Sequence, residues 1–214
     1  MKKTIFLIIL GVITVGFIVF GTFKHLGFWL DKDYDNKGFS IHYDYATDDD
    51  DPDGNGGRFN KTLDQFSGIK LNTSIGAVRI QEGSGYYIEA IYDKPYLKPN
   101  YEVRNGVLTV GQHTRKSKSG NHNCKIVITV PSGADIKSLD IESNVGDVDI
   151  RNITGNRLNV SLNIGEVELY NIDFNNIEVT NNIGEVSVKT ADDIENYTLR
   201  LSSDIGAVNV KGNS

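Results

Sequence analysis

The chain of 214 residues has one cysteine and no long basic run, and each shortage excludes a class of protein. A lone Cys124 cannot close an internal disulfide, so the fold depends on packing. No histidine or second cysteine lies at ligand spacing in the strand that holds it, and its alternation with Ile126, Ile128 and Val130 indicates a buried strand residue. The net charge of −6 argues against an electrostatic nucleic-acid interface.

Charged residues are also absent from residues 4–23, an apolar segment near the N-terminus. A helix of about twenty such residues crosses roughly 30 Å of hydrocarbon, and a cleaved signal peptide would have a shorter apolar run of about 7 to 15 residues. Residues 1–30 are therefore predicted to form one transmembrane anchor. Lys2 and Lys3 favour a cytoplasmic N-terminus at the cell membrane and an extracytoplasmic C-terminal domain.

Glycine is plentiful, with 22 residues, and several glycines recur in the same local context. The last four of these are separated by 19, 19 and 22 residues, and each is flanked by aliphatic residues at fixed positions: seven, five and one before it, and two and four after it. The five glycines are Gly76, Gly146, Gly165, Gly184 and Gly206. A period of two marks half-buried strands, and the alternation changes parity across each glycine, so the chain must bend there.

A unit of about twenty residues with two short strands cannot bury its own apolar face, so such units must stack. The sequence therefore predicts an all-β, parallel β-helix-like solenoid over residues 59–214, with coils of 19–22 residues. Residues 31–58 are predicted to be an acidic, Gly-rich juxtamembrane spacer. Residues 86–92, 101–112 and 124–131 read as inserted strands, the second of them a hairpin that turns at Asn105 and Gly106.

A predicted strand ends in Val130 and Pro131 and is followed by Ser-Gly-Ala-Asp and by Asn144-Val-Gly-Asp-Val148. This combination resembles the bacterial β-strand-repeat family named "putative adhesin", domain of unknown function 4097. Residues 59–83 look like the N-terminal coil of that family. With the apolar segment in front, the chain resembles the membrane-anchored LiaG-type proteins of Gram-positive envelope-stress systems. The resemblance implies an external β-helix-like domain and supplies no catalytic residues.

Acidic residues suggest two cation sites. Asp147, Glu166 and Glu185 follow successive glycines, and stacking in register would bring neighbouring carboxylates about 4.8 Å apart. Such a row could bind Ca²⁺ or could simply face water. Asp49, Asp51 and Asp53 resemble the start of a calcium loop, although its twelfth position is Asn60 rather than glutamate and Pro52 interrupts it. No cofactor is required by either pattern, and Ca²⁺ is the one candidate.

Two further groups are polar. The residues two positions before the glycines are expected to form a structural ladder at the corners: Asn144, Asn163, Asn182 and Asp204. A basic loop with Arg115, Lys116 and Lys118 could contact anionic head groups or a cell-wall polymer, or could simply keep a hairpin tip soluble.

Together these features predict a non-enzymatic, membrane-anchored binding or scaffold module of the bacterial cell envelope, with a role in envelope stress. A calcium-binding adhesin or sensor is the alternative, and an envelope glycan hydrolase or lyase is a weaker one, because no catalytic grouping is visible. The edge of the last coil, residues 197–210, is a candidate surface for self-association or for a protein partner.

Overall fold

A computed structural model describes residues 49–50, 56–112 and 123–212, which belong to a compact unit spanning residues 45–214. The predicted anchor and most of the predicted spacer lie outside the described residues. Within the described part, the helices are two short 3-10 turns, η1 (Pro95–Leu97) and η2 (Ile194–Asn196). No helix there is long and apolar enough to cross a membrane.

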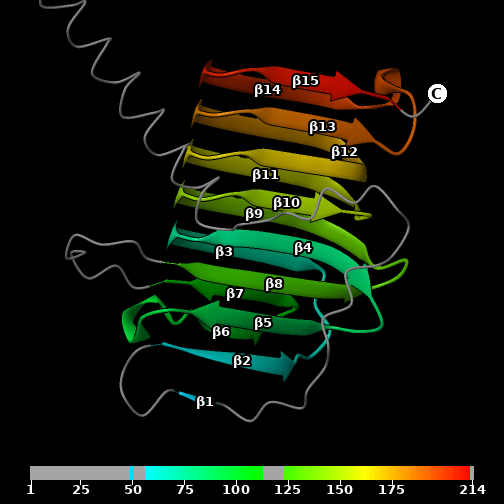
Figure 1. The fold of residues 1–214 in the computed structure, drawn as a ribbon. Helices are drawn as coiled ribbons and strands as arrows, with labels where there is room; N and C mark the ends of the chain where they lie inside the picture. The colour runs from blue at the N-terminus through cyan, green and yellow to red at the C-terminus, as the bar shows by residue number, and fades with distance from the viewer. Residues whose placement is uncertain (1–48, 51–55, 113–122, 213–214) are drawn as a thin grey trace, which may run out of the picture. The chain divides into compact units, whose positions relative to one another are not determined.

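The described chain is otherwise built of strands (Figure 1). Before the large stack these are β1 (Asp49–Asp50), β2 (Gly57–Thr62), β3 (Gly68–Ile75), β4 (Ala77–Gly83), β5 (Tyr87–Tyr92), β6 (Asn100–Arg104), β7 (Val107–Gly111) and β8 (Cys124–Pro131). They are followed by β9 (Asp135–Val145), β10 (Val148–Arg151), β11 (Thr154–Ile164), β12 (Val167–Ile183), β13 (Val186–Thr190), β14 (Thr198–Ile205) and β15 (Val208–Lys211).

These strands lie on two faces, here called sheet A and sheet B. Sheet A has the order β1-β2-β5-β8-β4-β10-β12-β13-β15, and sheet B has the order β6-β7-β3-β9-β11-β12-β14. The long strand β12 belongs to both, since residues 167–172 pair with β10 and β13 while residues 173–183 pair with β11 and β14. The chain thus passes from sheet B to sheet A at each glycine corner, and in β12 it returns from sheet A to sheet B within one strand.

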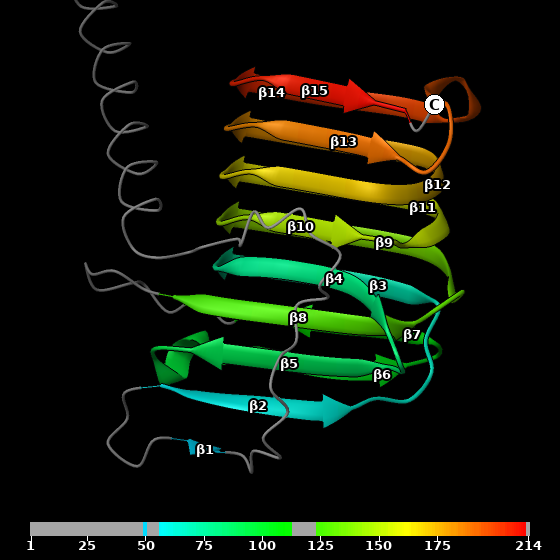
Figure 2. The same ribbon diagram turned by 45° about the vertical axis from the view of Figure 1, so that its right-hand side comes forward.

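Five coils stack in parallel, each running from a strand of sheet B through a glycine corner to a strand of sheet A (Figure 2). The register matches the sequence repeat: Ile69 pairs with Leu139, and Leu158 pairs with Leu139 on one side and Ile177 on the other. The prediction of an all-β fold of stacked coils is therefore confirmed.

The inserted strands differ from a uniform parallel solenoid. β8 is parallel to β4 but antiparallel to β5, and β5 is antiparallel to β2. The predicted hairpin turns at Asn105 and Gly106, both with positive φ, and joins β6 to β7. These strands lie on the side of β3 and β4 away from the later coils, so the coil at Gly76 pairs directly with the coil at Gly146. Residues 59–83 thus hold an antiparallel strand, β2, followed by a true coil.

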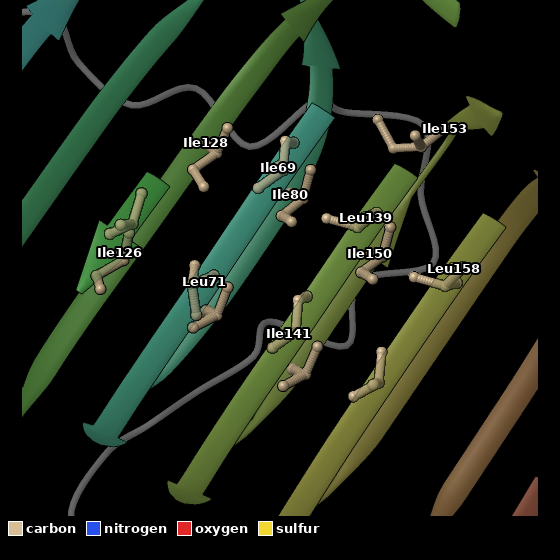
Figure 3. Close-up of a cluster of buried hydrophobic side chains, with 14 of the residues drawn as sticks. Ile69, Leu71, Ile80, Ile126, Ile128, Leu139, Ile141, Ile150, Ile153 and Leu158 are labelled. Carbon is tan, nitrogen blue, oxygen red and sulfur yellow. The ribbon is translucent and has the colours of Figure 1, made fainter. Parts of the chain in front are cut away.

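The core lies between the two sheets (Figure 3). In the first four coils, the aliphatic residues seven and five before the glycine and two and four after it are buried; Ile69, Ile80, Leu139 and Ile150, for example, are fully buried. The residues one before the glycine are at most half-buried, because they lie at the bend. Burial of each such side chain stabilises the fold by about 1.5–3 kcal/mol.

The last coil is the exception to this burial. Leu199, Leu201 and Val210 are only partly buried, while Ile205 and Val208 are 51% and 39% exposed. The residues at the same positions one coil earlier are covered by the last coil. The aliphatic residues of the last coil would be buried in the same way only by a further layer.

Candidate functional site

The five repeating glycines form a column at one edge of the molecule. All have positive φ, between 133° and 157° for the coils from Gly76 to Gly206. A Cβ built on Gly146, Gly165, Gly184 or Gly206 would overlap the carbonyl oxygen of the preceding glycine in the column. The spacing between coils therefore leaves room only for hydrogen at this corner, and the repeated glycine is a packing requirement of the stack.

The amide row beside this column is hydrogen-bonded along the stack. Asn163 Nδ2 donates to Asn144 Oδ1 over 2.7 Å, and Asn182 Nδ2 donates to Asn163 Oδ1 over 2.9 Å. Asp204 occupies the next position, and its ionised carboxylate has no N–H to donate to Asn182. The ladder thus runs through three coils, and the acidic residue changes its chemistry at the last one.

Two more ladders were not predicted from the sequence. Asn171 Nδ2 donates to Asn152 Oδ1, and Asn175 Nδ2 donates to Asn156 Oδ1, at 2.8 and 3.0 Å. The sequence does contain a signal for these ladders, because the two asparagines of each pair are separated by 19 residues, the same interval as the glycines. Asn152 and Asn171 also have positive φ, a conformation that asparagine tolerates better than most residues, so they mark the second corner of the coil.

A buried polar column inside the corner was also missed. The column lies three positions before the glycines and is interrupted by the buried Leu162 in the coil at Gly165. In the first two coils Thr73 Oγ1 donates to Ser143 Oγ over 3.0 Å. In later coils Asn181 Nδ2 donates to the Gly165 carbonyl over 2.9 Å and Ser203 Oγ donates to the Gly184 carbonyl over 2.8 Å. These side chains form hydrogen bonds with one another or with corner carbonyl groups. Their residue types differ from coil to coil, so the aliphatic repeat does not predict them.

The acidic row makes hydrogen bonds of its own. Asp147 Oδ1 accepts from the Glu166 backbone N–H at 3.1 Å, and Glu185 Oε1 accepts from Ser187 Oγ and Asn209 Nδ2. Burial raises the pKa of the Asp147 carboxyl, an effect that the Glu166 N–H opposes and nearby Asp149 reinforces. Among the described residues no group of three or more His, Cys, Asp or Glu is placed to hold a metal ion.

The other predicted contact residues are not placed by the structure. Asp51 and Asp53 of the calcium-loop pattern, and Arg115, Lys116 and Lys118 of the basic loop, lie outside the described residues. Of Asp49 the structure describes only the backbone, which lies in the short strand β1 and pairs with β2.

The outer face of sheet A carries a network of charges. Asp149 is buried, with its carboxylate 2.7 Å from Arg79 and 2.7 Å from Arg151, and Arg151 also reaches Glu168 at 2.9 Å. Arg151 and Lys189 both lie over the ring of Tyr170. Because these charges neutralise one another across β4, β10 and β12, the network fits a role in fixing neighbouring coils in register.

The outer face of sheet B offers an open groove of about 430 Å³. It crosses β9, β11, β12 and β14, so it runs along the stack rather than along one strand. Both signs of charge and several amides line it: Asp140, Arg157, Asn159, Asn176, Glu178, Thr198 and Arg200. Arg157 lies 3.6 Å from Asp140, and its side chain remains 60% exposed, so its guanidinium can also reach a ligand.

Cys124 occupies the corner position in the layer next to Gly76, and it is fully packed. Its Sγ lies 3.6 Å from the Leu97 carbonyl, and burial raises the pKa of the thiol to about 12. Gln112 Oε1 accepts from the backbone N–H groups of Ser74 and Ile75 beside it. A thiol protonated at neutral pH is a poor nucleophile, in agreement with a structural role.

The fold and these in-register arrays define a β-strand-repeat protein with a glycine-cornered coil. A family model described as Toastrack DUF4097 matches residues 66–214, and the chain belongs to that family. No curated protein is similar enough to the chain to count as a match.

Solved structures share the fold. A "putative cell adhesion protein" from Clostridium sporogenes is 17% identical, with a TM-score of 0.57 and coverage of 74% of this chain and 100% of that one. A "putative adhesin" from Bacteroides fragilis is 16% identical, with a TM-score of 0.33 and coverage of 72% and 93%. A "putative lipid binding protein" from Parabacteroides distasonis is 16% identical, with a TM-score of 0.30 and coverage of 75% and 93%. At these identities the first similarity establishes the fold alone, and the other two carry no argument.

Proposed function

We propose that this protein is a non-enzymatic, membrane-anchored module that binds a polymer of the bacterial cell envelope outside the cytoplasmic membrane. The observation that carries the proposal is the groove on sheet B, which crosses four strands of four successive coils and is lined by charged and amide side chains. An extended polymer that lies along the stack can meet equivalent polar positions at intervals of about 4.8 Å.

The scaffold is suited to such a ligand because its outward positions are held by parallel ladders on both sheets and by a continuous dry core. Preorganised side chains lose little conformational freedom on binding, which lowers the cost of binding a long, weakly held polymer. Charged and amide groups along the groove match hydroxyl, amide and anionic groups of envelope glycans and wall polymers.

The predicted anchor at residues 1–30 and the resemblance to LiaG-type proteins support the place of action and a role in envelope stress of Gram-positive bacteria. The Clostridium sporogenes structure is named a "putative cell adhesion protein", and that name agrees with a binding function.

Sedimentation with insoluble cell walls tests the proposal. The full chain in mild detergent is mixed with sacculi of a Gram-positive bacterium, prepared with and without their wall teichoic acid. We expect Arg157→Ala to weaken binding about fivefold, as loss of roughly 1 kcal/mol of charge-assisted hydrogen bonding predicts. Arg104→Ala is the matched control, since Arg104 is an exposed arginine on β6, away from the groove.

The two wall preparations identify the ligand class, because binding lost with teichoic acid indicates the anionic polymer and binding retained indicates the glycan. Failure of the chain to sediment with either preparation, or equal effects of both arginine variants, would overturn the proposal. The same assay in calcium chloride or in EDTA separates the calcium-dependent adhesin, whose binding would disappear with the chelator.

A further inference from the structure

The last coil presents two strand edges that no described element covers. Among the described residues, β14 pairs only with β12, and β15 pairs only with β13. One coil earlier, Val186 is fully buried, whereas Val208 in the same column is 39% exposed, and Ile205 is 51% exposed. Unpaired edges beside exposed aliphatic side chains favour the addition of another strand.

We propose that a second copy of this chain covers the last coil, with β14 of the two copies paired antiparallel about a twofold axis at Ser202. A twofold contact requires a surface that complements itself. β14 has this property, because Arg200 and Asp204 are equally distant from Ser202 and both are exposed. In this register each Arg200 lies opposite Asp204 of the other copy.

The inward side chains fit the same register. Leu199 and Ile205 are also equally distant from Ser202, so each lies opposite the other across the pair and the exposed Ile205 gains an aliphatic neighbour. A shift by one residue in the pairing would set inward side chains against outward ones. A pairing centred on Arg200 or on Asp204 would oppose like charges, which destabilises a strand pair.

On sheet A, the same axis brings β15 towards its copy and so covers Val208 and Val210. Among the described residues the opposite end is built differently, since β6 of sheet B is an antiparallel strand of a hairpin and β2 of sheet A pairs with β1. The two ends therefore differ, and the self-complementary charges of β14 select end-to-end pairing of like ends. Arg200 also lines the groove on sheet B, but the pairing is argued from the free edge of β14 and requires no bound polymer.

Site-specific crosslinking tests the pairing in the full chain in detergent. Ser202→Cys places a thiol opposite its own copy, and mild oxidation should produce a disulfide-linked dimer. Thr180→Cys is the matched control, because Thr180 is an exposed residue in register with Ser202 but one coil further from the end. The native Cys124 is buried and should not crosslink in either variant. Absence of a dimer with Ser202→Cys, or an equal yield with Thr180→Cys, would overturn the proposal.

A charge exchange then tests the register. In the Ser202→Cys background, Arg200→Asp or Asp204→Arg alone should reduce the dimer yield about fivefold or more, because like charges then face each other. The double variant restores opposite charges and should restore the yield. A double variant as impaired as the single ones would contradict the Arg200–Asp204 pairing. Arg200 also lines the groove on sheet B, so polymer binding is tested at Arg157 and Arg104 on other strands, and the pairing is measured by crosslinking without polymer. Either idea can therefore fail without the other.

Discussion

Replacing Gly165 with alanine tests whether the column of corner glycines sets the spacing of the coils. Gly165 has a φ of +143°, which side-chain-bearing residues rarely adopt, and this strain costs about 1–3 kcal/mol. The new Cβ would also overlap the Gly146 carbonyl oxygen, a backbone atom that moves only if two coils separate. Overpacking of this kind costs about 1–3 kcal/mol. The expected loss is therefore about 4 kcal/mol, a large part of the roughly 5–15 kcal/mol that stabilises a typical domain.

Gly106→Ala is the matched control for this substitution. Gly106 has a φ of +74° in the β6–β7 turn, but a Cβ built there meets no heavy atom within 4 Å, so only a backbone cost of about 1 kcal/mol remains. Urea unfolding followed by far-ultraviolet circular dichroism measures both changes in the free energy of unfolding. A loss for Gly165→Ala no greater than that for Gly106→Ala would show that the coils are not held apart by the corner, and would refute the packing argument.

Two further predictions concern the core and pH. Leu139→Ala should cost about 2–5 kcal/mol, whereas Leu199→Ala, at the same column position in the partly exposed last coil, should cost less than half as much in the same urea assay. Asp147→Asn should raise stability at neutral pH: burial lifts the folded pKa of Asp147 above its unfolded value, so its ionisation destabilises the fold as the pH rises through that range. The difference in melting temperature between Asp147→Asn and the parent chain should disappear in acid, where both side chains are neutral, and a gain that persists there would contradict the assignment.

Most of the fold could be predicted because its repeat is local and regular. Aliphatic residues at fixed distances from each glycine report inward-facing positions, and the change of parity reports the corner. The position of the inserted strands could not be predicted in this way. β8 has the alternation of a coil strand, and only pairing with β4 on one side and β5 on the other shows that the insertion extends the sheet beyond the first coil.

The polar side chains were harder to interpret because function and structure use the same residue types. The row at Asn144, Asn163 and Asn182 was predicted as a ladder from its period, and the structure supplies the bonds. The acidic row has the same period, yet Asp147 and Glu185 bond to neighbouring protein donors, a use of carboxylates that spacing alone does not distinguish from cation binding. The groove on sheet B escaped prediction because its lining comes from strands whose outward residues share no single type.

The stack separates two kinds of constraint on this sequence. Inward positions and corner glycines are fixed by the spacing of the coils, so a change there acts on stability in every layer it touches. On sheet B the outward asparagine ladders also join neighbouring coils, whereas the charged groove residues Arg157 and Glu178 take no part in those ladders, so their chemistry can change with little cost to the fold. If binding resides on this outer face, Arg157 and Glu178 can be exchanged for other polar residues with little effect on unfolding and a measurable effect on cell-wall binding, whereas no such separation exists at the corners.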